Sequence, residues 1–303
     1  MTTIAFIGLG NMGGPMAANL VAAGHTVRGF DVVPAALEHA AESGVIVAED
    51  AAAAVSGSDM VITMLQSGAQ VLAVTRTLLA GATPGTLFVD SSTIDVADAI
   101  AARDLVVAAG FRGMDAPVSG GVGGAAAGTL TFMVGAEPAD FEAALPVLEV
   151  MGGRVVHCGG SGAGQAAKIC NNMILGISMI AVSEAFVLGE KLGLSNEALF
   201  EVASAASGQC WALTTNCPVP GPVPTSPANH DYQPGFSGAL MAKDLGLALA
   251  ALEQTGTAAE LGPLAARIYR RFADEGGAAR DFSGIVTVIR ENSDSKNSER
   301  VTA

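Results

Sequence analysis

The sequence predicts an α/β fold in which an N-terminal, doubly wound domain is followed by an all-α C-terminal domain, with a long helix joining the two. Three observations lead to this prediction. Short β-rich runs alternate with alanine-rich helical runs as far as about residue 160, and strand signals then stop. A Gly-x-Gly-x-x-Gly pattern stands directly after the first β-rich run. Such alternation is typical of parallel strands joined by crossover helices.

The first half of the chain supplies all the predicted strands. The β-rich runs cover residues 3–10, 25–31, 59–65, 86–93, 111–119, 129–135 and 153–159. Segments of helical length between them cover residues 12–23, 70–80, 95–109 and 139–150. Because strands and helices alternate in this way, we expect one α/β domain over residues 1–162.

The second half reads as helices only. One long helix is predicted over residues 164–192, and others over residues 195–206, 238–253, 260–275 and 282–290. Prolines and glycines are too dense in residues 217–235 for regular structure, so we predict a long loop there. We expect the all-α domain to span residues 163–291 and residues 292–303 to form a polar, frayed tail.

Composition narrows the class of protein and its partners. The 303 residues are enough for two domains, and with half of them apolar and 15% charged the chain should be globular. A formal charge of −14 repels phosphate backbones and anionic lipids. We therefore expect neither a nucleic-acid partner nor a membrane surface.

Cysteine usage and the absence of targeting signals point to a reducing compartment. Four cysteines lie neither in a CxxC pair nor near histidines at metal-ligand spacing, which predicts free thiols and no metal site: Cys158, Cys170, Cys210 and Cys217. No run of about 18 uncharged residues has the apolar density of a membrane span. The N-terminus runs straight into a strand without a basic region. We expect a soluble cytoplasmic protein.

The glycine pattern after the first strand predicts a dinucleotide site in a Rossmann domain. Gly8 permits a tight turn, Gly10 lets a pyrophosphate approach the backbone, and Gly13 lets helix and strand pack closely. The helix that follows offers unpaired N–H groups to the phosphates, and we include the intervening Asn11 and Met12 among the candidate cofactor-binding residues.

Asp31 makes NAD the expected cofactor. It ends the second strand, 18 residues after Gly13, where a carboxylate binds ribose hydroxyls and repels a 2′-phosphate. Arg28 is the one cation nearby, and it would favour NADP if its side chain reached the 2′-phosphate position beside Asp31. The alternative is that the glycines are ordinary turn residues and Asp31 is a cap.

Two further strand ends belong to the same edge of the sheet. Ligands of open α/β sheets lie beyond the carboxyl ends of the strands, which points to residues 64–66 and 91–93. Thr93 is equally suited to cap the helix that follows, as are Ser92 and Asp95.

Lys168 is the best candidate for proton transfer. None of the four histidines has a convincing setting, whereas Lys168 and Asn172 lie four apart in an apolar helical segment and share one face. Desolvation lowers a lysine pKa, which makes proton loss near neutrality feasible. The composition is equally consistent with a structural role for both residues. In that case Lys168 extends to water and Asn172 bonds to a loop carbonyl.

A glycine-rich turn at Ser119, Gly120 and Gly121 is the candidate substrate site. It follows a strand and could present a hydroxyl and backbone N–H groups to a carboxylate, as a small anion nest does. A plain glycine-rich turn is the alternative.

Four motifs together resemble one family. "FIGLGNMGGPMAANL", "DAPVSGGVGGAAAGTL", "GAGQAAKICNNMILG" and "LMAKDLGLAL" are similar, in this order, to motifs of the β-hydroxyacid dehydrogenases, and the resemblance runs from residue 4 to about residue 290. It implies NAD-dependent oxidation of a small carboxylate by a homodimer or homotetramer that assembles through its helical half.

The resemblance also assigns roles to residues of this sequence. It implies that Lys168 is the catalytic acid/base, that Asn172 assists it, and that Ser119 with Gly120 holds the substrate carboxylate. The positions that it implies for cofactor contact are Leu65, Thr93 and Lys243. The sequence departs from the family at Gln66, where proline is usual, and we expect a less rigid cofactor loop there.

Within the family, the likeness is greatest to the bacterial branch that oxidises 3-hydroxyisobutyrate to methylmalonate semialdehyde in valine breakdown. The segment around Trp211 carries that distinction, and this side chain either lines an apolar wall beside the substrate methyl or packs the proline loop. The alternatives are a related enzyme acting on tartronate, succinic or glyoxylic semialdehyde, or an NAD-binding sensor without turnover.

Overall fold

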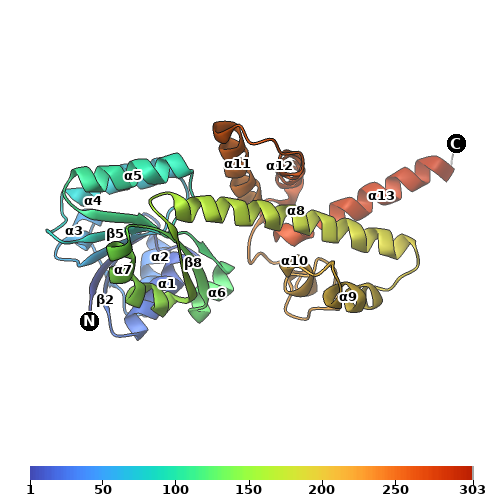
Figure 1. The fold of residues 1–303 in the computed structure, drawn as a ribbon. Coiled ribbons are helices and arrows are strands. Elements are labelled where there is room, and N and C mark those ends of the chain that lie inside the picture. The colour runs from blue at the N-terminus through green and yellow to red at the C-terminus, as the bar shows by residue number, and fades with distance from the viewer. Residues whose placement is uncertain (302–303) are drawn as a thin grey trace. The chain divides into compact units, whose positions relative to one another are not determined.

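The computed structural model describes residues 1–301, with side chains described as far as residue 295 (Figure 1). The chain divides into two compact units, Met1–Lys168 and a second unit that begins at Ile169. Helix α8 (Ala163–Lys191) starts in the first unit and continues into the second. The predicted fold class, a Rossmann domain followed by a helical domain, is confirmed.

The first unit is built on one mixed sheet. Its strand order is β3-β2-β1-β4-β5-β6-β8-β7, with β9 beside β8. The strands are β1 Thr3–Ile7, β2 Thr26–Phe30, β3 Ile46–Val47, β4 Met60–Thr63, β5 Leu87–Asp90, β6 Arg112–Asp115, β7 Val118–Ser119, β8 Leu130–Gly135 and β9 Gly152–Gly159. The helices are α1 Gly13–Ala22, α2 Pro34–Glu42, α3 Ala51–Val55, α4 Gly68–Leu79, α5 Val96–Ala108, α6 Gly121–Ala127 and α7 Pro138–Met151.

The sheet is not wholly parallel, which corrects the expectation from alternation. Strands β1 to β6 are parallel to one another, but β8 runs antiparallel to both β6 and β7, and β9 is parallel to β8. A parallel crossover needs about a dozen residues or more. Only α6 and short turns separate β7 from β8, so the chain reverses there instead.

Both faces of the sheet are covered by helices, as side-chain alternation requires. Ile4 and Phe6 of β1 belong to a core shared with α1 and α7, whereas Ala5 and Ile7 belong to a core shared with α3, α4 and α5. Successive residues of a strand point to opposite faces, so all four are buried. Because β1 to β6 run in one direction, their carboxyl ends and the loops that follow them lie at one edge of the sheet.

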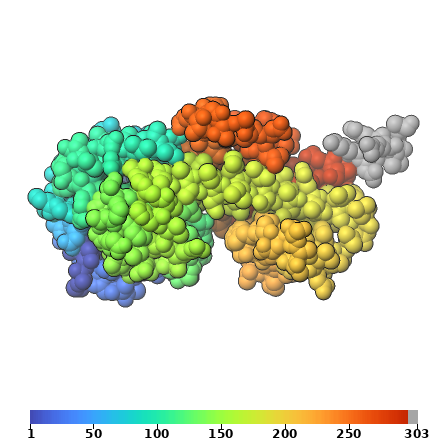
Figure 2. All heavy atoms as spheres, in the orientation of Figure 1, coloured from blue at the N-terminus to red at the C-terminus, as the bar shows by residue number. Residues whose placement is uncertain are grey.

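The second unit is helical over the residues described, apart from one isolated bridge between Ser237 and Asp281. After α8, its helices are α9 Asn196–Ala205, α10 Trp211–Thr214, α11 Gly238–Thr255, α12 Leu261–Phe272 and α13 Ile285–Val301. Short helical turns lie at Pro227–Asn229, Ala273–Gly277 and Phe282–Gly284. Helices α9 and α10 form a continuous surface with the adjoining part of α8 (yellow to orange in Figure 2).

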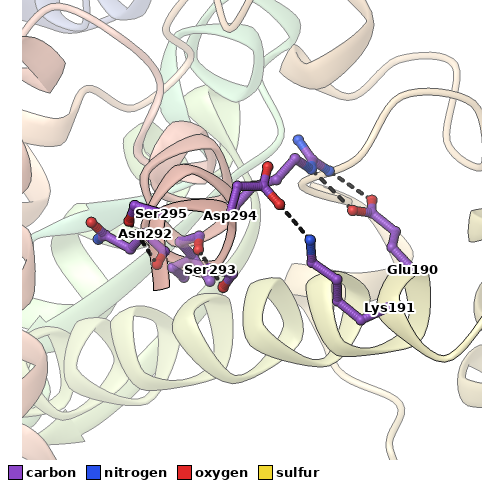
Figure 3. A network of polar contacts seen from close by, with 8 residues as sticks. Glu190, Lys191, Asn292, Ser293, Asp294 and Ser295 are labelled. Atoms are coloured by element: carbon purple, nitrogen blue, oxygen red, sulfur yellow. Dashed lines mark hydrogen bonds and ion pairs between the residues drawn. The ribbon is translucent and has the colours of Figure 1, made fainter. Parts of the chain in front are cut away.

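The last helix is longer than the sequence suggested. We predicted that it ends at Arg290 and that residues 292–303 fray, but α13 continues to Val301, and residues 302 and 303 lie outside the described part. Arg290 donates two hydrogen bonds to Glu190, at 3.0 and 2.7 Å, and Lys191 pairs with Asp294 (Figure 3). These pairs tie the polar face of α13 to the end of α8.

By length and composition, α8 is apolar enough to cross a membrane. It is also a core helix of the second unit, with Met179, Phe186 and Val187 buried against other helices. Core helices of globular domains also meet this criterion of length and apolar composition.

Candidate active site

The three glycines of the loop between β1 and α1 meet different surroundings. Gly8 has a φ of +95°, and a Cβ there would overlap the Met64 carbonyl oxygen. A Cβ at Gly13 would overlap the Gly8 carbonyl oxygen. A Cβ at Gly10 would meet nothing within 4 Å. Gly8 and Gly13 are thus needed by the fold, while Gly10 borders open space, as the close approach of a pyrophosphate to the backbone would require.

Asp31 follows β2 and is held against the glycine loop. Its Oδ2 accepts the Leu9 amide at 2.7 Å, and its Oδ1 accepts the Val33 amide at 2.9 Å. Arg28 instead donates to the Ser56 carbonyl, and Val32 is 85% exposed. The Arg28 guanidinium is thus bonded to Ser56 and not to Asp31. A carboxylate fixed at this position suits the ribose hydroxyls of NAD.

The ends of β4 and β5 bring the next candidates together. The Leu65 amide donates to Ser92 Oγ at 2.8 Å, and Ser92 Oγ donates to Asp90 Oδ1 at 2.6 Å. The Gln66 amide donates to Gln70 Oε1 at 3.1 Å, a bond that the family's proline could not make. The substitution therefore replaces ring rigidity with a hydrogen bond.

Asp95 rather than Thr93 caps α5. The Asp95 side chain accepts the Ala97 amide at 2.7 Å, so the capping role that we considered for Thr93 belongs to its neighbour. Thr93 remains a candidate for the cofactor, at the carboxyl end of β5.

Asp90 is a buried acid in this cluster. Burial raises its pKa above the usual value, against hydrogen bonds from Ser92 and Thr63 that lower it. Its Oδ2 finds no hydrogen-bond partner among the side chains and backbone described. This carboxyl group favours its protonated form more than an exposed aspartate does.

Ser119, Gly120 and Gly121 lie at the same edge as the cofactor candidates. Strands β6 and β7 both run antiparallel to β8, so they point the same way. Ser119, the last residue of β7, pairs with Thr131, whereas Asp115 at the end of β6 pairs with Gly135, so β7 ends further along β8, toward its N-terminal end, than β6 does. Gly120 and Gly121 have φ values of +139° and +63° and lead into α6. Successive backbone amides in such a turn can face one anion.

Lys168 and Asn172 lie one turn apart on α8, and both are buried. Lys168 is 6% exposed, which is not the environment of a snorkelling lysine, and Asn172 is 1% exposed. The Asn172 amide Nδ2 donates to Asp244 Oδ2 at 2.5 Å, not to a loop carbonyl, and its Oδ1 accepts from Asn171 at 3.0 Å.

Asp244 of α11 is a residue that the sequence did not single out. Within the second unit its Oδ2 holds Asn172, and its Oδ1 lies 3.2 Å from Lys243 Nζ. In the sequence, Asp244 stands directly after Lys243 in the motif "LMAKDLGLAL", but only Lys243 was assigned a role there. Trp211 begins α10 and is 51% exposed, so it leaves a large apolar surface uncovered in the chain as described.

Comparison with known proteins agrees with this geometry. Residues 3–160 match the family model of the NAD binding domain of 6-phosphogluconate dehydrogenase. Residues 162–289 match the family model described as NAD-binding of NADP-dependent 3-hydroxyisobutyrate dehydrogenase. A probable 3-hydroxyisobutyrate dehydrogenase of Mycobacterium tuberculosis is 58% identical over 97% of this chain and 100% of its own length. The chain belongs to the β-hydroxyacid dehydrogenase family.

Two further matches have L-serine in their names. A solved structure of Mycobacterium tuberculosis 3-hydroxyisobutyrate dehydrogenase with L-serine matches with a TM-score of 0.92 at 58% identity, covering 96% of this chain and 99% of that one. A NAD-dependent L-serine dehydrogenase of Pseudomonas aeruginosa is 45% identical over 93% of this chain and 96% of its own. This β-hydroxyacid dehydrogenase is an oxidoreductase whose cofactor is NAD.

Proposed function

We propose that this β-hydroxyacid dehydrogenase oxidises 3-hydroxyisobutyrate to methylmalonate semialdehyde, with Lys168 as general acid/base. The observation that carries the proposal is the burial of Lys168 and Asn172 one turn apart on α8. A buried lysine loses its proton more readily than an exposed one, because burial disfavours its charged form. Within the proposal, residues 1–162 form the dinucleotide-binding domain and residues 163–291 form the substrate and oligomerisation domain.

The chain's own residues account for the proton and the orientation. In its neutral form, Lys168 Nζ takes the proton of the substrate C3 hydroxyl, and the electron pair of that O–H bond forms the carbonyl. The Asn172 amide nitrogen carries two hydrogens, so it can donate one to Asp244 and one to the reacting oxygen. Bound NAD supplies the acceptor for the hydride that leaves C3.

Binding is assigned to groups at the strand ends. The open space at Gly10 takes the pyrophosphate beside Asn11, Met12 and Gly13, and Asp31 takes the ribose hydroxyls. Further cofactor contacts are assigned to Leu65, Gln66, Thr93 and Lys243. The Ser119 hydroxyl and the amides of Gly120 and Gly121 hold the substrate carboxylate, and Trp211 faces its methyl group.

A substrate and cofactor panel tests the proposal. Initial rates of oxidation with 3-hydroxyisobutyrate, L-serine and 3-hydroxypropionate, and of reduction with tartronate, succinic and glyoxylic semialdehydes, should give the highest kcat/KM for 3-hydroxyisobutyrate with NAD. Equal or faster oxidation of the unmethylated acid would exclude 3-hydroxyisobutyrate as the preferred substrate.

Lys168→Ala tests the mechanism and the alternative of a silent sensor. General acid–base catalysis contributes about 10²- to 10⁴-fold, so kcat should fall by that factor. NAD affinity, measured by calorimetry, should stay within a few fold. Unchanged turnover would end the assignment of Lys168, and no turnover with any acid of the panel in the wild type would favour a sensor.

L-Serine oxidation is the second candidate function. It is favoured by the 45% identical L-serine dehydrogenase and by the L-serine in the 58% identical structure. L-Serine keeps the 3-hydroxy carboxylate but carries an ammonium in place of the methyl group, which an apolar wall at Trp211 would disfavour. Trp211→Ala should therefore lower kcat/KM for 3-hydroxyisobutyrate more than for L-serine.

We further propose a homodimer or homotetramer that works in the cytoplasm in valine breakdown. Large apolar side chains of the second unit are exposed on α8 and α9, among them Ile174, Leu188 and Val202. Exposed apolar surface of this kind marks protein–protein contacts. Sedimentation equilibrium should give a mass two or four times that of the chain.

A further inference from the structure

We propose that Asp115 and Gln165 form a brace that positions Lys168 for proton transfer. The inference rests on the proposed role of Lys168. Both brace residues and Lys168 belong to the first unit, and both brace residues are buried. Neither touches the reacting atoms in this proposal; they act through the turn of α8 that carries the lysine.

Asp115 binds the beginning of α8 through both of its carboxylate oxygens. It ends β6, and it accepts the Gly162 amide on Oδ1 at 2.6 Å and the Gln165 amide on Oδ2 at 2.9 Å. The first amides of a helix have no partner within the helix and carry its positive dipole end. A carboxylate 50 residues earlier in the chain therefore fixes this helix end to the sheet.

Gln165 fixes the same turn to the end of β5. Its Oε1 accepts the Ile94 amide at 3.2 Å, and its Nε2 donates to the Ser92 carbonyl at 2.7 Å. Ser92 in turn accepts the Leu65 amide on its hydroxyl. The brace thus reaches from the α8 turn to the loop after β4, where Leu65 and Gln66 are cofactor candidates.

Close backbone packing leaves this turn no room to shift. A Cβ at Gly164 would overlap the Met133 carbonyl oxygen, and a Cβ at Gly135 would lie 2.8 Å from the Gly164 amide nitrogen. The helix start is therefore seated on β8 as well as on Asp115. Lys168 follows Gln165 by three residues, on the same face of the helix.

The position of a general base matters at the scale of an ångström. A misplacement of about 1 Å by a change away from the chemistry can cost on the order of 10²-fold in rate. Lys168 has a long side chain, so a shift of the turn from which it projects also shifts its Nζ. The brace fixes that turn to the end of β6 through Asp115 and to the end of β5 through the Gln165 side-chain amide.

The test is a double-mutant cycle on the full enzyme. Gln165→Met keeps the volume of the side chain but removes both hydrogen bonds, and Asp115→Asn replaces one carboxylate oxygen with a donor. For each variant, the single-turnover rate constant with saturating NAD and substrate should fall at least tenfold. NAD binding stoichiometry should stay at one per chain, and KM for NAD should stay within about threefold.

The cycle separates positioning from loss of structure. In the Lys168→Ala background, Gln165→Met should leave the residual rate unchanged, because its effect passes through the lysine. Asp140→Asn is the matched control: it alters a buried aspartate of the same unit that pairs with Arg112 at 3.3 Å, and its rate should match that of the wild type.

Three results would overturn the brace. These are a wild-type rate in Gln165→Met, a fall that is equally large without the lysine, or a fall explained by a lower NAD stoichiometry. If Asp115→Asn fails to fold, Gln165→Met still decides. Retention of turnover in Lys168→Ala would instead refute the proposed function, so the two failures are distinguishable.

Discussion

At the scale of single residues, we expect Gly10 to matter for cofactor binding and Gly13 for the stability of the fold. A methyl group at Gly10 would occupy only open space in the chain alone, whereas one at Gly13 would overlap the Gly8 carbonyl. We expect Gly10→Ala to fold normally and to raise KM for NAD about tenfold or more, which corresponds to a loss of about 1.4 kcal/mol.

Gly13→Ala is the contrasting variant. Overpacking should lower its free energy of unfolding by about 1–3 kcal/mol. Urea denaturation and NAD titration of both variants check the pair. The interpretation is wrong if Gly10→Ala unfolds more easily than Gly13→Ala, or if it binds NAD as the wild type does.

Asp90 makes stability depend on pH. Its pKa is raised in the folded chain because of burial, so the folded state holds the proton more tightly than the unfolded state does. Its contribution to stability is complete below the unfolded pKa, about 3.9, and is lost as pH rises through the folded pKa.

Asp90→Asn removes this titration. The free energy of unfolding of the variant, relative to that of the wild type, should therefore increase as pH rises above about 4. Urea denaturation at pH 4, 5, 6 and 7 measures it. Thr75 and Asp90 both line one small cavity of the first unit, so Thr75→Val is an uncharged control change there and should show a constant offset. An equally constant offset for Asp90→Asn would refute the argument.

The residues that bear chemistry were easier to predict than the residues that hold them. Lys168 and Asn172 are four apart in the chain, so helical periodicity alone relates them. Asp244 and Asp115 reach the helix from 72 and 50 residues away along the chain. Their partners depend on tertiary packing, which no local pattern in the sequence encodes.

At the scale of elements, the proline loop of residues 217–235 is tied down by one carboxylate. Asp281 is buried and accepts from Asn216, Gly235, Phe236 and Ser283. Within the loop, the Tyr232 hydroxyl donates to the Pro218 carbonyl at 2.9 Å. This loop, which contains the short helical turn Pro227–Asn229, is therefore held at its C-terminal end by a buried acceptor.

We expect Asp281→Ala to lower the free energy of unfolding by about 2–4 kcal/mol, because it leaves several buried donors unpaired. Denaturation in urea and the rate of proteolytic cleavage within residues 217–235 check this. Asp274→Ala, at an exposed aspartate, is the control. A loop that is cut no faster in Asp281→Ala would contradict the anchoring role.

Prediction of elements succeeded where the hydrophobic period was long and failed where it was short. The long helix α8 and most strands of the sheet were predicted from their patterns. The two-residue strand β3 was not predicted, and the run over residues 111–119 forms two strands, β6 and β7. Helices α2, α3, α6 and α10 were not predicted, since segments of four to nine residues give little helical periodicity. The extension of α13 was missed because ion pairs with α8 stabilise a sequence that is polar throughout.

At the scale of the whole molecule, the charge of −14 opposes the approach of anionic ligands. Salt screens such repulsion, and the Debye length falls from about 30 Å at 0.01 M to about 8 Å at 0.15 M. We expect kcat/KM for the acid substrate to rise a few fold over that range, while kcat at saturation stays constant. A fall with salt would mean that local positive groups dominate the encounter.

The overall plan of the chain could be predicted, because both domains carry repeated local signals. The alternation of strand and helix signals predicted the α/β domain, and the loss of strand signals after about residue 160 predicted the helical domain. The antiparallel β8 could not be read in advance, since strand direction depends on the length of the connection and not on the strand itself.

Asp31 carries a constraint for redesign of cofactor specificity. The carboxylate assigned to the ribose also accepts the amide of Leu9, inside the phosphate-binding loop. Replacing it with a neutral residue to admit a 2′-phosphate would remove the repulsion and, in the same step, release the loop that must grip the pyrophosphate. A conversion to NADP therefore needs a second substitution that restores an acceptor for the Leu9 amide; a cation added at residues 32–33 alone would give an enzyme that binds both cofactors poorly.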